Sequence, residues 1–169
     1  LPPEKVMTVL AAYQELALEI IQEEGGRVDK FLGDGILATF GAVMPSSTYA
    51  ADAVRTSRRL VTEIAAQQSR FTKAGWPELL RVGTAVAAGS IMVGTVGSTD
   101  RLEFTVIGDA VNRAAKLEDA NKHQRSAALT DGKTYALARE QGYTGPEAEQ
   151  RPAVLVPGLG NPVDLVVLA

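Results

Sequence analysis

Two charged side chains occupy unusual places in an otherwise apolar stretch at residues 27–41. Lys30 alternates with Val28 and Leu32, so a regular strand would place this cation on the same face as two apolar residues. Asp34 is followed by a glycine, and Asp-Gly accepts the positive φ angles of a tight hairpin turn. The stretch therefore predicts a β-hairpin with a carboxylate projecting from its tip. Two interpretations stay open: a turn residue with a lysine that extends to solvent, or two ligand-binding groups.

A second stretch, residues 100–118, places polar groups where a strand leads directly into a helix. Asp109 is well placed as the N-cap of that helix. Asn112 and Lys116 are four residues apart, so both side chains point from one helical face. An amide and a cation stacked in this way could hold an anionic, polar ligand near the end of the strand. The alternative is that both are solvent-facing residues of an amphipathic helix.

Several kinds of protein are excluded or disfavoured by motifs that the sequence lacks. There is no Gly-x-x-x-x-Gly-Lys-Ser/Thr loop, no Gly-x-Gly-x-x-Gly after the first strand and no Gly-x-Ser-x-Gly elbow. The net charge is −3 and the Lys and Arg residues are scattered, so we expect no nucleic-acid partner. The absence of cysteine excludes disulfides and Cys-based zinc sites. The single His123 lies in a polar stretch and is expected to be solvated.

The sequence shows no run of 18 apolar residues and no signal peptide, so we expect no membrane segment within it. A cysteine-free domain suits a reducing compartment, and we expect a cytoplasmic location, with any membrane tether outside this chain. The chain opens with Leu1-Pro2-Pro3 rather than Met, in the manner of a helix entry, and we expect further residues upstream.

Hydrophobic periodicity and turn residues predict helices and strands that alternate along the chain. The expected helices cover residues 2–24, 49–73, 110–120 and 131–139. The expected strands are the hairpin within 27–41, then 80–89, 102–107, 127–130, 153–156 and 163–168, with 90–97 as a Gly-rich strand or loop and 142–152 as a loop. Because hairpins are mixed with helices, the pattern indicates an α+β fold, with a largely antiparallel sheet covered by helices on one face.

The two polar stretches together carry a more specific signal than either alone. Lys-Phe-Leu-Gly-Asp-Gly-Ile-Leu-Ala-Thr-Phe-Gly at 30–41, followed by Asp-Arg-Leu-Glu-Phe-Thr-Val-Ile-Gly-Asp-Ala-Val-Asn-Arg-Ala-Ala-Lys-Leu at 100–117, closely resembles the class III adenylyl/guanylyl cyclase catalytic domain. The resemblance covers essentially the whole chain and includes Gly-Ser-Ile-Met-Val-Gly-Thr-Val-Gly at 89–97. It implies one catalytic domain at residues 1–169 with a ferredoxin-like βαββαβ core, acting as a homodimer with active sites at the subunit interface.

The resemblance also implies a bacterial-type adenylate cyclase, which converts ATP to cyclic AMP and pyrophosphate. Matched by position, Lys30 and Thr105 are the residues that read the purine. A lysine can donate to adenine N1, and a threonine hydroxyl can accept from the adenine N6 amine. Gly33 belongs to the same substrate-binding motif.

The remaining matched residues concern the metals, the ribose and the phosphates. The family uses two divalent metal ions, Mg²⁺ or Mn²⁺, and such hard cations bind carboxylate oxygens. By position, Asp34 is one metal ligand, Asn112 orients the ribose, and Lys116 is the transition-state residue that contacts phosphate.

Three departures from the family pattern matter. The other metal-binding Asp belongs to a strand just before the helix at Pro2, so we expect the domain to lack its N-terminal β-strand. Lys116 stands where the family usually has Arg, and lysine keeps the charge without the planar bidentate fork. Leu159 lies near the place of a phosphate-binding Lys in animal enzymes, so triphosphate binding must rely on other groups.

These departures keep other functions open. One alternative is a catalytically degenerate cyclase-homology domain that dimerises and binds nucleotide as a regulatory module, and another is a guanylate cyclase. A GGDEF-type diguanylate cyclase is disfavoured, because residues 32–36 lack the second acidic residue of that signature. Family members are often fused to regulatory domains, and none is visible in this chain.

Overall fold

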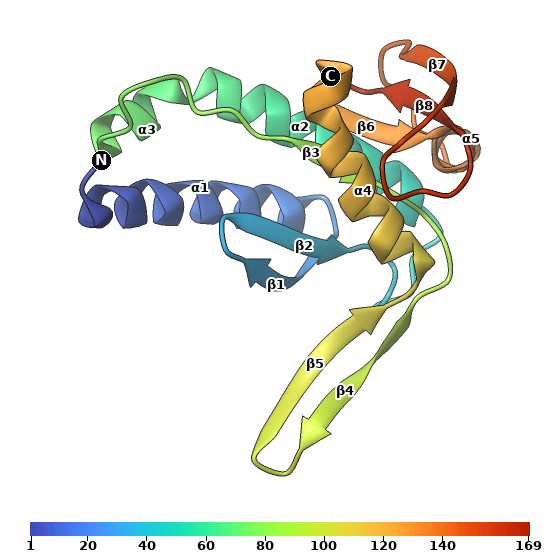
Figure 1. The fold of residues 1–169 in the computed structure, drawn as a ribbon, viewed down its shortest axis with the longest axis horizontal. Coiled ribbons are helices and arrows are strands. Elements are labelled where there is room, and N and C mark those ends of the chain that lie inside the picture. Colours follow the sequence, from blue (N-terminus) through green and yellow to red (C-terminus); the bar gives the residue numbers. More distant parts are fainter.

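The computed structural model describes residues 1–169, in which five helices and eight strands follow one another in mixed order (Figure 1). The helices are α1 (Pro3–Glu23), α2 (Tyr49–Ala66), α3 (Gln68–Ala74), α4 (Asp109–Gln124) and α5 (Gly132–Glu140). The strands are β1 (Arg27–Leu32), β2 (Gly35–Thr39), β3 (Thr84–Val86), β4 (Met92–Ser98), β5 (Arg101–Ile107), β6 (Ala128–Asp131), β7 (Glu149–Val154) and β8 (Val163–Val167). None of the helices combines the length and the apolar character needed to cross a bilayer.

Four strands form the central sheet, in the order β3-β6-β8-β7. β3 and β6 are parallel, whereas β8 is antiparallel to both β6 and β7. The hairpins β1–β2 and β4–β5 are antiparallel and form two separate two-stranded sheets. Four of the five strand pairings are therefore antiparallel, and the predicted α+β class with largely antiparallel pairing is confirmed.

Helices cover both faces of the central sheet, and not one face as the sequence indicated. On one face, Ala128 and Val166 pack with buried residues of α2 and α5. On the other face, Leu129 and Leu165 pack against Leu117 of α4. All four residues of β6 are buried, as in a strand covered on both sides, and successive side chains serve opposite layers.

A separate apolar cluster joins α1 to the long helical segment formed by α2 and α3; its buried members are Val9, Leu16, Ile20, Ile64 and Phe71. α1 lies alongside the β1–β2 hairpin (Figure 1). Gly26 makes the tight connection between them possible, because a Cβ there would lie 2.5 Å from the Phe40 ring. The first hairpin is thereby held against the helical body.

Two predicted elements are shorter than expected, for different reasons. The helix expected at 49–73 divides at Gln67, whose φ of −105° and ψ of 30° interrupt the helical conformation. The strand expected at 80–89 is reduced to β3. The Gln68 side chain donates to the Leu80 carbonyl and accepts from the Leu80 N–H, so this backbone bonds to a helix instead of a strand.

Two other elements are longer than expected. β7 begins at Glu149, inside the predicted loop 142–152, because Glu149, Gln150 and Arg151 pair with β8. α4 continues to Gln124 and ends where Arg125 adopts the left-handed conformation. The β7 extension depends on pairing with β8, and Arg151 of β7 donates to the Gln124 carbonyl at the end of α4.

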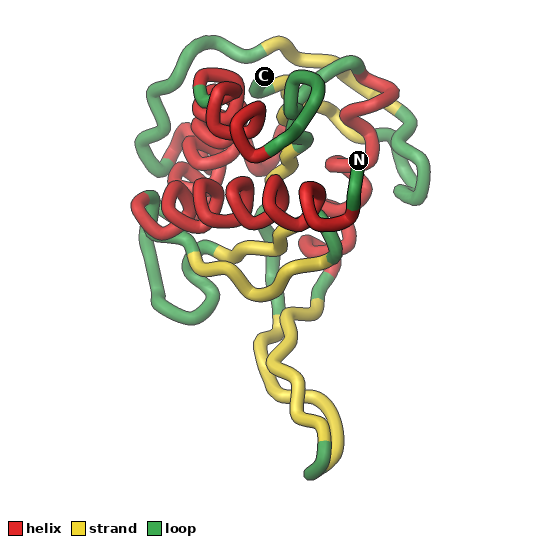
Figure 2. Tube along the Cα trace, turned by 90° about the vertical axis from the view of Figure 1, so that its left-hand side faces the viewer, coloured by secondary structure: helices red, strands yellow, loops and turns green.

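The β4–β5 hairpin, residues 92–107, projects from the body as a long arm (Figures 1 and 2). All seven residues of β4 are exposed. The exposed apolar side chains of this β4–β5 arm are Met92, Val93, Val96, Leu102, Phe104 and Ile107. Val106 is buried at the base of the arm, next to Thr105, and this base adjoins β1.

Candidate functional site

A β-bulge in β1 determines where Lys30 lies. Val28 pairs with Ala38 and Lys30 pairs with Leu37, so Asp29 is an extra residue without its own partner on β2. Regular alternation predicted that Lys30 shares the face of Val28, and this premise is wrong because the bulge interrupts the alternation. The Lys30 ammonium instead comes within 3.8 Å of the carboxylate of its sequence neighbour Asp29.

Lys30 also reaches the β4–β5 arm and binds two side chains there. Its Nζ donates to Thr105 Oγ1 at 3.2 Å and to Glu103 Oε1 at 3.1 Å. Thr105 and Glu103 are two residues apart in β5, so they lie on one face of that strand. The structure thus brings together Lys30 and Thr105, which are 75 positions apart and which the sequence assigned to the same ligand.

Sequence reasoning missed two carboxylates that flank Lys30. The Glu103 side chain is 73% exposed, whereas that of Asp29 is 2% exposed and neither of its oxygens accepts a hydrogen bond. A signal for Glu103 was available, since it precedes Thr105 by two residues and shares its strand face. The sequence gives no comparable signal for Asp29, because a regular strand would direct its side chain away from Lys30.

Gly33 and Asp34 form the exposed tip of the β1–β2 hairpin. Gly33 has a φ of +63°, in the left-handed region that glycine adopts without strain. Burial, with smaller contributions from the charges of Asp34 and Glu118, raises the pKa of Tyr13 in α1 to about 12. Burial and neighbouring carboxylates, Asp34 among them, also raise the pKa of Glu118 in α4. The tip therefore lies near both helices.

Asp34 offers one hard oxygen ligand of the kind that Mg²⁺ and Mn²⁺ prefer. The structure contains no group of three or more Asp, Glu, His or Cys side chains that could hold a metal ion together. Asp34 therefore stands without such a group around it, and it remains the candidate metal ligand of this chain.

Asn112 and Lys116 lie one turn apart on the exposed surface of α4. The predicted N-cap is wrong: Gly108 takes that place, Asp109 is the first helical residue, and no side chain caps this end. A Cβ on Gly108 would lie 2.7 Å from the Ser90 carbonyl oxygen, so glycine lets β5 turn directly into the helix. No hydrogen bond or ion pair joins Asn112 or Lys116 to the residues around Lys30.

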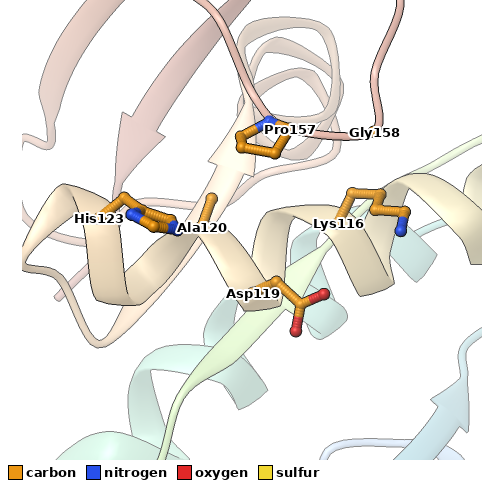
Figure 3. A pocket seen from close by; sticks show the side chains of 6 residues that line it. All are labelled: Lys116, Asp119, Ala120, His123, Pro157 and Gly158. Carbon is orange, nitrogen blue, oxygen red and sulfur yellow. The ribbon is translucent and has the colours of Figure 1, made fainter.

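Lys116 lies beside the loop between β7 and β8, where an open pocket of about 300 Å³ is lined by Lys116, Asp119, Ala120, His123, Pro157 and Gly158 (Figure 3). The stem of Lys116 runs close to Gly158, where a Cβ would lie 2.7 Å from both Cδ and Cε. His123 is exposed at the other end of this pocket (Figure 3). Leu159 packs against the apolar cluster between α4 and the sheet, so it offers the pocket no polar group.

No family model matches this sequence. Its relatives include two proteins named as adenylate cyclases. Adenylate cyclase 1 of Rhizobium meliloti (strain 1021) is 30% identical over 138 residues, which make up 82% of this chain and 21% of that protein. Adenylate cyclase of Anabaena cylindrica is 34% identical over 121 residues, 71% of this chain and 24% of that protein. The chain thus spans less than a quarter of the length of these relatives.

Two solved cyclase structures match nearly the whole chain. The adenylyl cyclase CyaB from P. aeruginosa has a TM-score of 0.82 and 25% identity, covering 99% of this chain and 83% of that chain. The guanylyl cyclase Cya2 has a TM-score of 0.80 and 26% identity, covering 99% of this chain and 81% of that chain. Together with the two motifs and the sequence relatives, these matches establish that the chain belongs to the class III adenylyl/guanylyl cyclase catalytic domains.

Proposed function

We propose that this domain is an adenylyl cyclase, which converts ATP to 3′,5′-cyclic AMP and pyrophosphate. The observation that carries the proposal is the 3.2 Å contact between Lys30 Nζ and Thr105 Oγ1, at the meeting point of the two hairpins. Guanylyl and adenylyl cyclases share this fold, so the choice of base depends on side chains of this kind.

The chemistry of the pair favours adenine over guanine. Adenine presents an acceptor at N1 and a donor amine at N6, which suit the Lys30 ammonium and the Thr105 hydroxyl. Guanine presents a hydrogen on N1, and this donor would face the donor ammonium. A site built to pair with one set of donors and acceptors discriminates strongly against the other, because mismatched polar groups are left unpaired.

The remaining predicted residues fit the reaction at the ribose and the phosphates. The 3′-oxygen forms a bond to the α-phosphorus, and the bond to the bridging oxygen of pyrophosphate breaks. Asn112 would hold the ribose, and the Lys116 ammonium would stabilise negative charge on the phosphates. Asp34 would contribute one carboxylate ligand to a divalent metal ion, which when bound favours the deprotonated 3′-oxygen and neutralises phosphate charge.

We also propose that the active protein is a homodimer in which both subunits contribute to each site. In one chain, the group around Lys30 has no polar contact with Asn112 or Lys116. The β4–β5 arm carries six exposed apolar side chains, which is the composition expected of a surface that a partner covers. A strict monomer that makes cyclic AMP would contradict this part of the proposal.

The test supplies the full-length protein with ATP or GTP and Mn²⁺ and measures cyclic AMP, cyclic GMP and pyrophosphate. We expect cyclic AMP and pyrophosphate in equal amounts. Lys30→Glu should lower kcat/KM for ATP about 10- to 100-fold, since one charge-assisted hydrogen bond is lost. Lys73→Glu makes the same charge change on the exposed end of α3 and should leave kcat/KM unchanged.

Three results would point elsewhere. Preferential formation of cyclic GMP would favour a guanylyl cyclase. Nucleotide binding without any product would favour the regulatory cyclase-homology domain, for which Lys116 and Leu159 are the motivating departures. Unchanged ATP turnover in Lys30→Glu would disprove the purine-reading role of Lys30.

A further inference from the structure

The Asp29 carboxylate is buried, and its one stabilising partner is a nearby cation. Its side chain is 2% exposed, and neither oxygen accepts a hydrogen bond. Burying a carboxylate in this way is costly unless a cation or a hydrogen-bond donor compensates. The nearest cation is Lys30, whose Nζ lies 3.8 Å from Oδ2, which is within ion-pair range and longer than a hydrogen bond.

The backbone is shaped so that this pair can form. In a regular strand the side chains of residues 29 and 30 would point to opposite faces, and their charged ends could not meet. The bulge at Asp29 inserts one residue and redirects the local side chains, and bulges are common next to active sites. The irregular pairing therefore accounts for the closeness of the two charges.

Lys30 has three N–H groups and two flanking carboxylates that differ in environment. Thr105 and Glu103 each accept one hydrogen bond from Nζ. Two of the three N–H groups are thereby used, which leaves one free to donate to a purine. The Glu103 carboxylate is mostly exposed, so solvent screens its attraction, whereas the attraction of buried Asp29 is screened much less.

We propose that Asp29 is a positioning residue that holds the Lys30 ammonium at the base-reading site, against the attraction of the exposed Glu103, so that the third N–H can donate to the purine. This inference rests on the proposed base-reading role of Lys30. Asp29 would not touch the nucleotide, and its charge would restrict the ammonium to the region between β1 and Thr105. Loss of that charge would let Lys30 follow Glu103 toward solvent, so the site would discriminate less between adenine and guanine.

The first experiment compares Asp29→Asn, which keeps the size and removes the charge, with Glu103→Gln as the matched control on the exposed carboxylate. For Asp29→Asn we expect the ratio of kcat/KM for ATP to that for GTP to fall about tenfold, mainly through KM, because the base contact exists in both the ground state and the transition state. For Glu103→Gln we expect a change of less than threefold. Equal small effects in both variants would overturn the inference.

A double-mutant cycle distinguishes positioning from a purely structural role. If Asp29 acts through Lys30, then Asp29→Asn should have no further effect on selectivity in a Lys30→Met background. A full additional loss in that background would overturn the inference. Asp29→Ser, a smaller neutral residue, provides the same comparison if the asparagine variant does not fold.

Binding of 3′-deoxy-ATP and 3′-deoxy-GTP, which lack the reacting hydroxyl, separates this inference from the proposed function. If the unmodified protein makes no cyclic AMP but binds 3′-deoxy-ATP, and Asp29→Asn weakens that binding about tenfold, the activity proposal fails and the inference about Asp29 stands. If Asp29→Asn binds both analogues as the unmodified protein does, the inference fails whatever the activity. A protein that binds neither analogue overturns both.

Discussion

Two aspartates lie beside cations, Asp131 and Asp29, and they differ in how their carboxylates are stabilised. The Asp131 side chain is 9% exposed and lies 3.3 Å from Arg113 Nε. It also accepts hydrogen bonds from the Thr134 N–H at 2.8 Å and the Thr134 hydroxyl at 3.0 Å. The Asp29 side chain is still more buried, its cation is farther away, and it accepts no hydrogen bond.

The difference separates a group that stabilises the fold from a group that does not. Asp131 is the N-cap of α5, and through Arg113 it connects β6 to α4, so the folding of several elements depends on it. Asp29 connects no elements, and its burial opposes folding. An unsatisfied buried charge requires an explanation other than stability, and its proximity to Lys30 provides one.

Of the substitutions that test this comparison, Asp131→Ala should have the largest effect on the free energy of unfolding. It removes the helix cap, the acceptor of the buried Thr134 hydroxyl and the carboxylate that forms an ion pair with Arg113, which keeps only its hydrogen bond to the Ala88 carbonyl. We therefore expect the free energy of unfolding to fall by about 2 to 5 kcal/mol. Urea denaturation measures this change. Asp100→Ala, in the exposed turn of the β4–β5 arm, is the control and should change the value by less than about 0.5 kcal/mol. If Asp131→Ala changed stability as little as Asp100→Ala, Asp131 would not stabilise the fold and the proposed difference from Asp29 would be wrong.

The pH dependence of stability that arises from Tyr13 in α1 should be the next largest effect. The pKa of Tyr13 is raised from 10.0 to about 12, mainly by burial. Between these values the folded protein keeps a proton that the unfolded chain has lost, so stability present below pH 10 is lost as the pH rises to 12. We expect Tyr13 to contribute at most about 2.7 kcal/mol to this loss.

The measurement is urea denaturation at several pH values between 9 and about 12, compared with Tyr13→Phe, which has no phenol to titrate. The phenylalanine variant should show the shallower decline in that interval. Identical slopes for the two proteins would mean that the phenol is not shielded from solvent in the folded state.

Asp29→Asn should have the smallest effect on stability. The substitution removes a buried charge without breaking any hydrogen bond, so the free energy of unfolding should rise or change by less than about 1 kcal/mol. The same urea titration measures it. A fall as large as that of Asp131→Ala would show that Asp29 stabilises the fold, and the proposed division between the two aspartates would be wrong.

Much of the fold and part of the site could be predicted from the sequence, because they depend on local patterns. Alternating apolar residues and Asp-Gly located the β1–β2 hairpin, and the motifs paired Lys30 with Thr105 across 75 positions. The failures concern interactions between distant residues. The Gln68 side chain forms hydrogen bonds with the backbone of Leu80, which therefore does not join a strand. The bulge in β1 depends on which residues of β2 pair with it. Periodicity carries no information about either.

The two side chains that we propose to read the base belong to hairpins that share no sheet. Lys30 belongs to β1, in the hairpin that packs beside α1, and Thr105 belongs to β5, in the part of the arm that contacts β1. The arm itself projects away from the body (Figure 2). A small rotation of the arm about its base therefore changes the distance between Nζ and Oγ1 without disturbing either backbone ladder. Under the proposed base-reading roles, a force applied at the tip of the arm would therefore alter base discrimination at Thr105, roughly 17 Å away at ~3.3 Å per strand residue.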